Sequence, residues 1–353
     1  MEGETMVVIR YKSGLRLSQH PLAEMNTAVT SLNASSNGIK IYSGQNEIIL
    51  DQKRLDRIQE RQQLEAAIMP INEIVRQILR ALAEKRGFSV IRLGDAEILT
   101  LAQDTVFSTS VNVPVWGDLM SELCHDPALG KGDNNEVLRW RDMMYMSGIH
   151  YPDLNARDLL AQAVKTANVV GIPVRNRPGR SRAHLKLLEG FQTILLEIFK
   201  NLNLNYSNIQ LADSALHYLL FSSGWLHKIL FPSEHPEIYQ EYDFPPGYKP
   251  EVLLVGNRAG ELADVMVPRG IRISGVIKPV DMGNIDETMT AISNHSFDIA
   301  LIGAGVAAKI LCSSTATRMN RIAIDAGHLF DLIVDDYRHL KYQVARIPYD
   351  WML

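Results

Sequence analysis

The segment Arg92-Leu-Gly-Asp-Ala-Glu places two carboxylates, Asp95 and Glu97, one residue apart, directly after an apolar run. Paired carboxylate oxygens are ligands that Mg²⁺ and Mn²⁺ prefer, and Gly94 would permit the bend that turns both toward one ligand. A cation held there could neutralise a diphosphate while a phosphate group leaves. Equally, Asp95 could cap a helix with Glu97 in its first turn. Spacing alone leaves both interpretations open, and Arg92 could contact a ligand or form a surface ion pair.

A second candidate is the run FDIALIGAGVAAKIL at residues 297–311. Gly303 and Gly305 lie where an apolar strand is expected to pass into a helix, and Asp325 follows about twenty residues later, an order typical of a dinucleotide-binding fingerprint. Its place near the end of the chain argues against NAD(P), because a dinucleotide fold usually builds a second half behind this unit. Close strand–helix packing, contact with another ligand and an NAD(P) site all stay open.

Two further loops carry basic side chains. The loop RNRPGRSR begins at Arg175, ahead of an expected helix, and could bind an anionic group or simply be solvated. Gly256, Asn257 and Arg258 join an expected strand to a helix. They offer close backbone approach and hydrogen-bond donors to a ligand, or they form only a tight connection.

Two residues are candidate general bases because they follow expected strands. Asp213 ends the run IQLAD, and His328 ends the run IDAGH. Either side chain could accept a proton from a substrate hydroxyl. Asp213 could instead cap the next helix, and an isolated histidine is often structural.

The elements that must position these residues are short apolar strands alternating with helical patterns. This alternation predicts an α/β fold, with a Rossmann-like, mainly parallel sheet and helices on both faces. Ligands bind such sheets beyond the carboxyl ends of the strands, which is where the candidate residues fall. The expected strands are residues 88–93, 168–174, 209–213, 251–256, 271–277, 298–303 and 321–325.

The first 65 residues differ in texture and are expected to form a small N-terminal accessory block. Strands are expected at 6–11 and within 39–50, with a hairpin turn at Ser43-Gly44 and a charged helix behind them. Residues 66–353 form the main domain. The block could mediate self-association or recruit an acceptor. A small β block is marginal unless it packs on something, so of the two we favour a homodimer.

Bulk properties exclude some classes of protein. The chain has 353 residues and a formal net charge of −4, which does not suit a nucleic-acid-binding protein. It shows neither an apolar run of about 20 residues, as a membrane span requires, nor a signal peptide. We therefore expect a cytoplasmic protein, for which peripheral contact with a membrane stays compatible with the sequence.

Taken together, RLGDAE and FDIALIGAGVAAKIL…RIAIDAGH resemble the GT-D-fold glycosyltransferases, over roughly residues 68–335. The family's Arg-x-Gly-Asp-Gly-Glu element is matched except at Ala96, where the family prefers glycine. The late elements of the family are matched too, and LLVGNRAGEL resembles its middle strand and turn. The matching residues are Arg92, Gly94, Asp95 and Glu97 in the first element, and Gly303, Gly305, Asp325, Gly327 and His328 in the late ones.

The resemblance implies transfer of a sugar from a nucleotide-sugar, such as a UDP-sugar, to a glycan, glycolipid or glycoprotein. It implies that Asp95 and Glu97 bind Mn²⁺ or Mg²⁺ and the donor, and that Arg92, His328 and the turn at 256–258 complete the donor pocket. Two alternatives stay open: an NAD(P)-dependent oxidoreductase using the turn GAGVAA, and a non-catalytic sugar-nucleotide-binding or scaffold domain.

Overall fold

The computed structural model describes residues 8–11, 39–43, 46–50, 52–106, 145, 147–150, 152–174, 182–204, 209–222 and 224–337. The chain divides into two compact units, Met1–Ala66 and Ala67–Leu353. No helix in these ranges is both long and apolar enough to cross a membrane.

In the part of the N-terminal unit that the structure describes, there are three strands and one helix. Strand β2 (Ile39–Ser43) pairs antiparallel with β3 (Asn46–Leu50), as the expected hairpin requires, and β1 (Val8–Tyr11) pairs parallel with β2. The charged segment behind them forms helix α2 (Gln52–Ala66).

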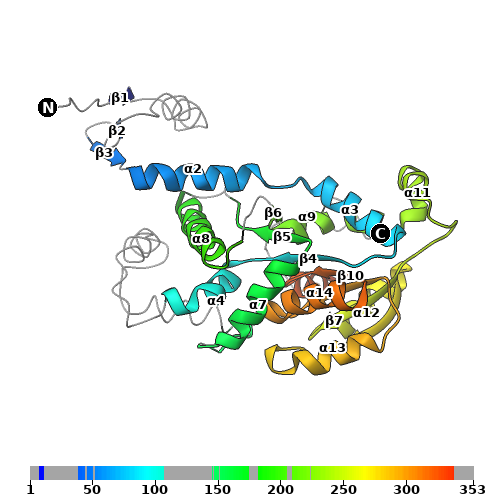
Figure 1. Ribbon diagram of the computed structural model, residues 1–353. Helices are drawn as coiled ribbons and strands as arrows, with labels where there is room; N and C mark the ends of the chain where they lie inside the picture. Colours follow the sequence, from blue (N-terminus) through cyan, green and yellow to red (C-terminus); the bar gives the residue numbers. More distant parts are fainter. Residues whose placement is uncertain are drawn as a thin grey trace. The chain divides into compact units, whose positions relative to one another are not determined.

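The second unit is built on a parallel sheet of seven strands (Figure 1). Its order is β6-β5-β4-β10-β9-β7-β8, and every neighbouring pair is parallel. This confirms the predicted Rossmann-like α/β fold. The strands are β4 (Phe88–Arg92), β5 (Val169–Ile172), β6 (Gln210–Asp213), β7 (Glu251–Gly256), β8 (Arg272–Ile277), β9 (Ile299–Gly303) and β10 (Ile322–Asp325).

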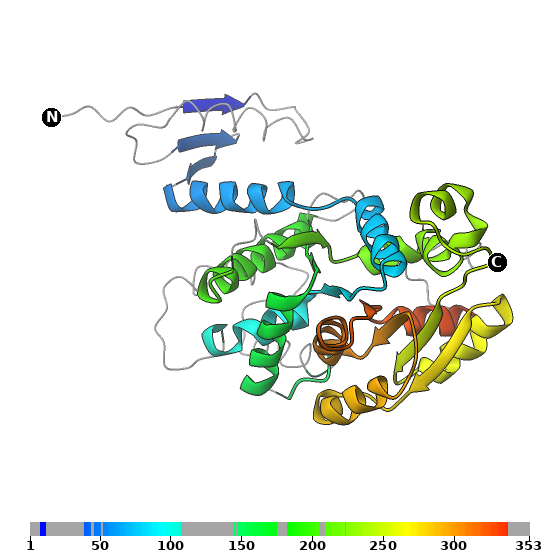
Figure 2. The same cartoon turned by 45° about the vertical axis from the view of Figure 1, so that its right-hand side comes forward.

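Helices cover both faces of this sheet (Figure 2). On one face, one hydrophobic cluster joins alternate strand residues to the apolar sides of several helices. Helix α3 shows why: Ile74, Val75, Ile78 and Leu82 recur at helical spacing and are all buried. The helices of this face are α3 (Ile71–Ala83), α9 (Leu216–Ser222), α10 (Trp225–Leu230), α12 (Ala259–Met266) and α15 (Leu329–Tyr337), with α11 (Pro236–Tyr242) packed on α3.

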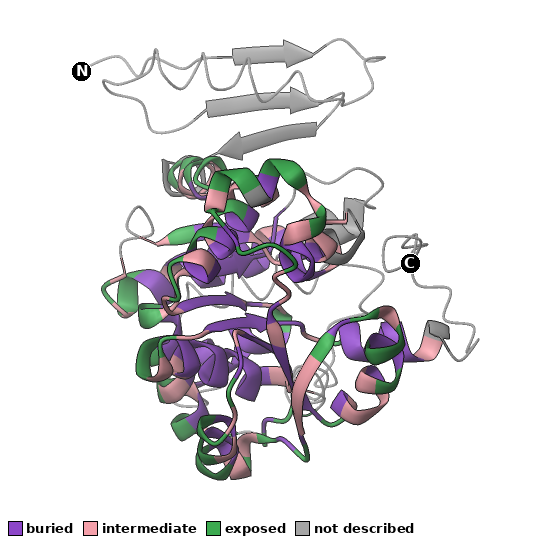
Figure 3. Cartoon of the chain, turned by 90° about the vertical axis from the view of Figure 1, so that its right-hand side faces the viewer, coloured by how far each residue is buried: buried purple, intermediate pink, exposed green. Residues whose placement is uncertain are grey.

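Helix α14 (Gly305–Met319) is central to the other face and packs on β4, β9 and β10. Its residues from Val306 to Ser313 are all buried, so it has almost no solvent side over this stretch. Figure 3 shows the buried residues gathered in the sheet and in the helices packed on it. Helices α7 (Leu154–Thr166) and α13 (Ile285–Ser293) pack on α14, while α4 (Asp95–Val106) packs on α7 and α8 (Arg182–Asn201).

The strand order creates a switch point between β4 and β10. The chain moves outward from β4 through β5 and β6, crosses to β7 and β8, and returns through β9 and β10. Sheets of this kind bind ligands in the crevice at such a point. Arg92 ends β4 and Asp325 ends β10, so the fold brings these distant residues together at the crevice.

Candidate functional site

A pocket of about 510 Å³ opens at the carboxyl ends of β4, β7, β9 and β10. This volume is within the range typical of small-molecule sites. Most of the residues predicted from the sequence line it, together with Lys309 and the segment Ser147–Gly148, which were not predicted. The predicted residues in its wall are Arg92, Gly94, Asp95, Glu97, Asn257, Arg258, Gly303, Gly305, Gly327 and His328.

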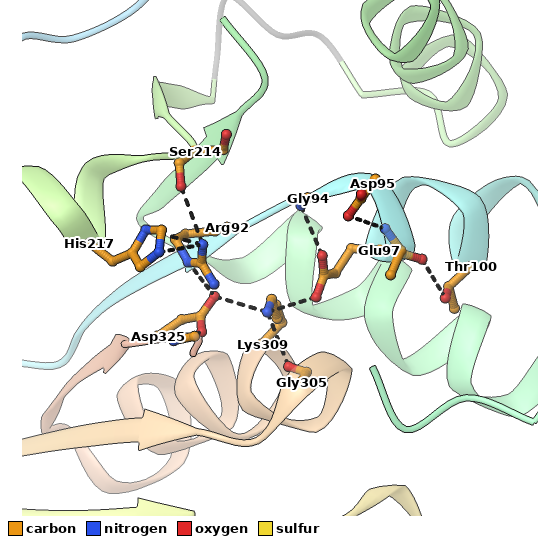
Figure 4. A network of polar contacts seen from close by, with 12 residues as sticks. Arg92, Gly94, Asp95, Glu97, Thr100, Ser214, His217, Gly305, Lys309 and Asp325 are labelled. Atoms are coloured by element: carbon orange, nitrogen blue, oxygen red, sulfur yellow. Dashed lines mark hydrogen bonds and ion pairs between the residues drawn. The ribbon is translucent and has the colours of Figure 1, made fainter. Parts of the chain in front are cut away.

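Asp325 lies beneath the pocket and is fully buried. Its Oδ2 accepts from Arg92 Nε at 3.2 Å and lies 3.1 Å from Lys309 Nζ, while Oδ1 accepts from the backbone N–H of Gly327 at 2.9 Å (Figure 4). Burial alone would raise the pKa of Asp325, but the charges of Arg92 and Lys309 outweigh it and hold that pKa below its ordinary value. Asp325 therefore anchors the site from below and does not line the pocket.

Lys309 is the residue that sequence reasoning missed. Its ammonium contacts Glu97 Oε1 at 2.8 Å, Asp325 Oδ2 at 3.1 Å and the carbonyl oxygen of Gly305 at 3.0 Å. Its three N–H donors thus match three acceptors. The lysine is 1% exposed within an otherwise apolar stretch of α14. That was the available signal, because a lysine with no solvent face needs a buried partner.

Glu97 has both carboxylate oxygens engaged within the chain. The carbonyl of Gly94 accepts from Ile98 N–H, which makes Gly94 the N-cap of α4, and Glu97 Oε2 accepts from Gly94 N–H at 2.9 Å. This is one half of a capping box. With Oε1 held by Lys309, Glu97 is only 6% exposed. The helix-start interpretation of Glu97 therefore describes its contacts in this structure.

Asp95 differs from Glu97 because its side chain is exposed at the pocket. Its Oδ1 accepts from the N–H of Ala96 at 2.9 Å. Surrounding protein atoms displace part of its hydration, and this raises the pKa of Asp95, with the negative charge of Glu97 adding to the rise. Asp95 is therefore the carboxylate of the pair that can face a ligand.

A divalent cation on both Asp95 and Glu97, as expected from the resemblance, does not fit these contacts. Within the described ranges, no three His, Cys, Asp or Glu side chains are grouped so as to hold a metal ion. A cation on Glu97 would also lie beside the Lys309 ammonium. Unit charges 4 Å apart repel by about 4 kcal/mol at an effective dielectric constant of about 20, and a divalent ion doubles this.

Two histidines, His217 and His328, lie near Arg92 with their ring centroids 5.6 Å apart. Arg92 Nη1 donates to the carbonyl of Ser214 at 3.3 Å and lies 3.1 Å from Nδ1 of the buried His217. His328 is exposed toward the pocket, and its Nε2 is hydrogen-bonded to the hydroxyl of Tyr218. Burial first, and the charge of Arg92 second, lower the pKa of both imidazoles. Both rings are therefore neutral at physiological pH.

Gly305 of the GAG turn packs closely against the backbone of Ser147. Gly305 has φ of +52°, and a Cβ there would collide with the carbonyl oxygen of Ser147. The same carbonyl accepts from Val306 N–H at 3.1 Å. A donor that a dinucleotide phosphate would use is thus occupied by the protein. Close packing is the interpretation that the contacts of Gly305 support.

Gly327 has a similar role, with φ of +55° and a Cβ position that would overlap the guanidinium of Arg92. A side chain there would displace Arg92 from the pocket. Gly256 pairs with Gly303 across β7 and β9, and it is not among the pocket-lining residues.

The polar side chains of the turn after β7 are already engaged within the protein, so they offer a ligand fewer contacts than the sequence suggests. Asn257 Oδ1 accepts from Val280 N–H at 2.9 Å. Arg258 donates to Glu261 and, at 2.6 Å, to Asp335; these bonds raise the pKa of Arg258. Both residues line the pocket, but the charge of Arg258 is already matched by neighbouring carboxylates.

The last two predicted residues lie elsewhere. Asp213 ends β6, separated from β4 by β5, and its Oδ1 accepts from Ala215 N–H at 2.9 Å just before α9. It does not line the pocket. Because α9 begins at Leu216, this bond forms an Asx turn ahead of the helix and not an N-cap, so the capping alternative is wrong as well. Arg175 and most of its basic loop fall outside the described residues.

The profile of a protein family described as a GT-D fold-like domain matches residues 69–235 and 236–333. No curated protein sequence matches the chain. Similar solved structures include a new glycosyltransferase (DUF1792) from Streptococcus sanguinis, 18% identical with a TM-score of 0.39, covering 80% of this chain and 91% of that one. Another, the highly conserved domain of unknown function 1792 with a distinct glycosyltransferase fold, is 16% identical with a TM-score of 0.44, covering 81% and 91%. The family match, and not these distant structures, carries the assignment.

The network beneath the pocket predicts a large stability effect at Lys309. Replacing Lys309 by Met leaves Glu97 and Asp325 buried without their shared cation. Breaking a buried ion pair by removing one partner costs about 3–5 kcal/mol, so we expect a loss of this size in the free energy of unfolding from urea titrations. Lys165→Met, at an exposed position of α7, should change it by less than about 0.5 kcal/mol. Equal effects would contradict the network.

His217 predicts a pH dependence of stability. The pKa of His217 is lowered in the folded chain. Below the ordinary histidine pKa of about 6.5, this residue therefore binds a proton in the unfolded chain but stays neutral in the folded chain. The stabilisation is therefore complete above that pH and is lost as the pH falls, by up to about 1.4 kcal/mol per pH unit for this histidine. Urea titrations of His217→Gln should show a shallower fall between pH 6.5 and 5. His150→Gln, at an exposed position, should keep the wild-type slope; a wild-type slope in His217→Gln would refute the prediction.

Proposed function

The chain belongs to the family of GT-D fold-like domains, and from this premise we propose that it is a glycosyltransferase that uses a nucleotide-sugar donor. The observation that carries the proposal is the pocket of about 510 Å³ at the switch point, with Arg92, Asp95 and His328 on its wall. A pocket of this size suits a nucleotide-sugar. We take a UDP-sugar, with a hexose, as the donor.

Arg92 is our candidate for contact with the donor's diphosphate. Its Nε and Nη1 are used by Asp325, Ser214 and His217, whereas Nη2 has no hydrogen-bond partner among the described residues. Nη2 can therefore donate to a phosphate oxygen while the rest of the guanidinium stays fixed. Donors held in place before the reaction stabilise the charge that develops as the phosphate leaves.

His328 is our candidate for the general base. Its neutral imidazole is exposed at the pocket, and its contact with Tyr218 fixes the ring. In the reaction, the acceptor hydroxyl attacks the anomeric carbon and the bond from that carbon to the diphosphate oxygen breaks. The hydroxyl proton passes to Nδ1 of the imidazole, because Nε2 is engaged by Tyr218. The nucleoside diphosphate leaves with the bonding electrons. The predicted alternative, Asp213, does not line the pocket.

The divalent cation expected from the sequence has no step in this proposal, because Glu97 is engaged by Lys309 and Gly94. The acceptor class, a glycan, glycolipid or glycoprotein, and a cytoplasmic location stay parts of the proposal. So do a homodimer supported by the N-terminal unit and peripheral membrane contact.

The two alternatives make different predictions. An NAD(P)-dependent oxidoreductase would need the GAG turn to receive a pyrophosphate, where Ser147 now accepts from Val306. A non-catalytic sugar-nucleotide-binding domain would bind the same donor as the transferase without turnover. No contact in the described residues favours this last alternative over a transferase.

Ligand binding tests the donor class. We expect UDP or UDP-sugars to raise the melting temperature in a thermal-shift screen, by an amount that grows with ligand concentration, and NAD(H) and NADP(H) to leave it unchanged. Stabilisation by the dinucleotides alone would reject the proposed donor class.

Turnover tests the candidate base. With a donor from the screen, His328→Gln should lower kcat for transfer or donor hydrolysis by about 10²-fold, because a positioned base contributes roughly this much. Donor binding measured by calorimetry should persist in this variant. Asp158→Asn, an exposed carboxylate on α7, is the control and should keep wild-type turnover. Full activity in His328→Gln would remove His328 from the mechanism, and no turnover with any donor would favour a binding domain.

A further inference from the structure

The element Asp95-x-Glu97 lies beside a buried cation that belongs to the chain. We propose that the ammonium of Lys309 takes the place of a divalent cation at this element, so that Glu97 is a positioning residue and not a metal ligand. The inference deepens the proposed function, and it rests on that function only for the identity of the donor. The contacts that support it are independent of the donor.

The first argument is the saturation of Glu97. Oε1 accepts from Lys309 at 2.8 Å, and Oε2 accepts from Gly94 N–H at 2.9 Å, at a side chain that is 8% exposed. A metal ion on Oε1 would displace the lysine or crowd it. A metal ion on Oε2 would take the hydrogen-bond partner of Gly94 at the start of α4.

The second argument is the balance of charge. Lys309 and Arg92 carry two positive charges, and Glu97 and Asp325 carry two negative charges within the same network (Figure 4). Buried charges are stable when they are paired and hydrogen-bonded. The network meets this condition with residues of the chain alone, so a divalent cation would add charge that none of these four residues balances.

The third argument is that the lysine is held in place. Gly305 starts α14 in a left-handed conformation and packs on the carbonyl of Ser147. The carbonyl of Gly305, one turn before Lys309, accepts from the ammonium at 3.0 Å. The neighbours Ala308 and Ile310 are buried and hold that part of the helix in the core. The ammonium therefore has little room to withdraw from Glu97.

This arrangement divides the two carboxylates by role. Glu97 ties α4 to α14 and supports the backbone of Gly94 under the pocket. Asp95, which is exposed, stays available to the donor or acceptor. Because no cation couples Glu97 to the donor, a chelator should not weaken donor binding.

The test is a titration of the full-length chain with Mn²⁺, followed by electron paramagnetic resonance of the free ion. We expect wild type, without nucleotide, to bind no Mn²⁺ at Asp95 and Glu97. The charge-matched double variant Lys309→Met/Asp325→Asn frees Glu97 while removing one buried carboxylate with the lysine. It should bind one equivalent of Mn²⁺, with an affinity at least about tenfold above any residual binding by wild type, since the repelling ammonium is gone.

Two further variants identify the ligands. Adding Glu97→Gln or Asp95→Asn to the double variant should abolish the gained binding, and Lys165→Met should behave as wild type. Mn²⁺ binding to wild type that Glu97→Gln weakens would overturn the proposal. A folded double variant that gains no Mn²⁺ would overturn it as well. If the double variant does not fold, the comparison of wild type with Glu97→Gln still decides.

A nucleotide arm separates this inference from the proposed function. The affinity of wild type for UDP, measured by calorimetry, should differ by less than about twofold between Mg²⁺ and a chelator. Coupling between two ligands is reciprocal, so a cation that does not bind at Asp95 and Glu97 cannot change the affinity for UDP through this element. A larger loss in chelator would overturn the inference while supporting a nucleotide site. Failure of UDP and other nucleotide diphosphates to bind would count against the proposed function and leave the Mn²⁺ result standing.

Discussion

The pocket depends on one buried interaction, the contact of Arg92 and Lys309 with the carboxylate of Asp325. This contact joins the ends of β4 and β10 to the first turns of α14, and Glu97 extends it to the start of α4. Removing a single partner would leave an uncompensated charge in the core, which is far more costly than losing a surface ion pair. The positions of the wall residues are therefore coupled and not set one by one.

The charged side chains can make this contact because glycines occupy positions just after the strands, where a side chain would not fit. Gly327 leaves room for the guanidinium of Arg92, and Gly305 lets α14 begin against the backbone of Ser147. In both cases the space that a side chain would fill is taken by another part of the protein. Gly305, which suggested a phosphate-binding turn, and Gly327 thus serve to bring charged side chains together beneath the pocket.

Much of the fold followed from the sequence because it depends on local pattern. The run EVLLVG was predicted as a strand and forms β7 over the same residues, and the pattern of Ile74, Ile78 and Leu82 gave α3 its buried face. Because the sheet was predicted to be mainly parallel, Arg92 and His328 could be placed at the carboxyl ends of its strands, and both line one pocket. The partners of each side chain depend on contacts across the sheet, which no local pattern encodes. For this reason Lys309 was missed, and the engagement of Arg258 by Asp335 was not foreseen.

Glu97 shows how one short motif can satisfy two structural demands. A glutamate three residues after an N-cap can bind the cap's backbone N–H, and a carboxylate at a strand end can bind a cation. Here Glu97 binds the backbone N–H of the N-cap residue Gly94. The cation beside Glu97 is the ammonium of Lys309, from a helix more than two hundred residues away in sequence. The ammonium of a buried lysine is attached covalently to the chain, whereas a metal ion must be bound from solution and must release water. With the lysine in this place, folding alone fixes the charges around the donor. The exposed Asp95 is then the carboxylate of the pair that contacts the substrates.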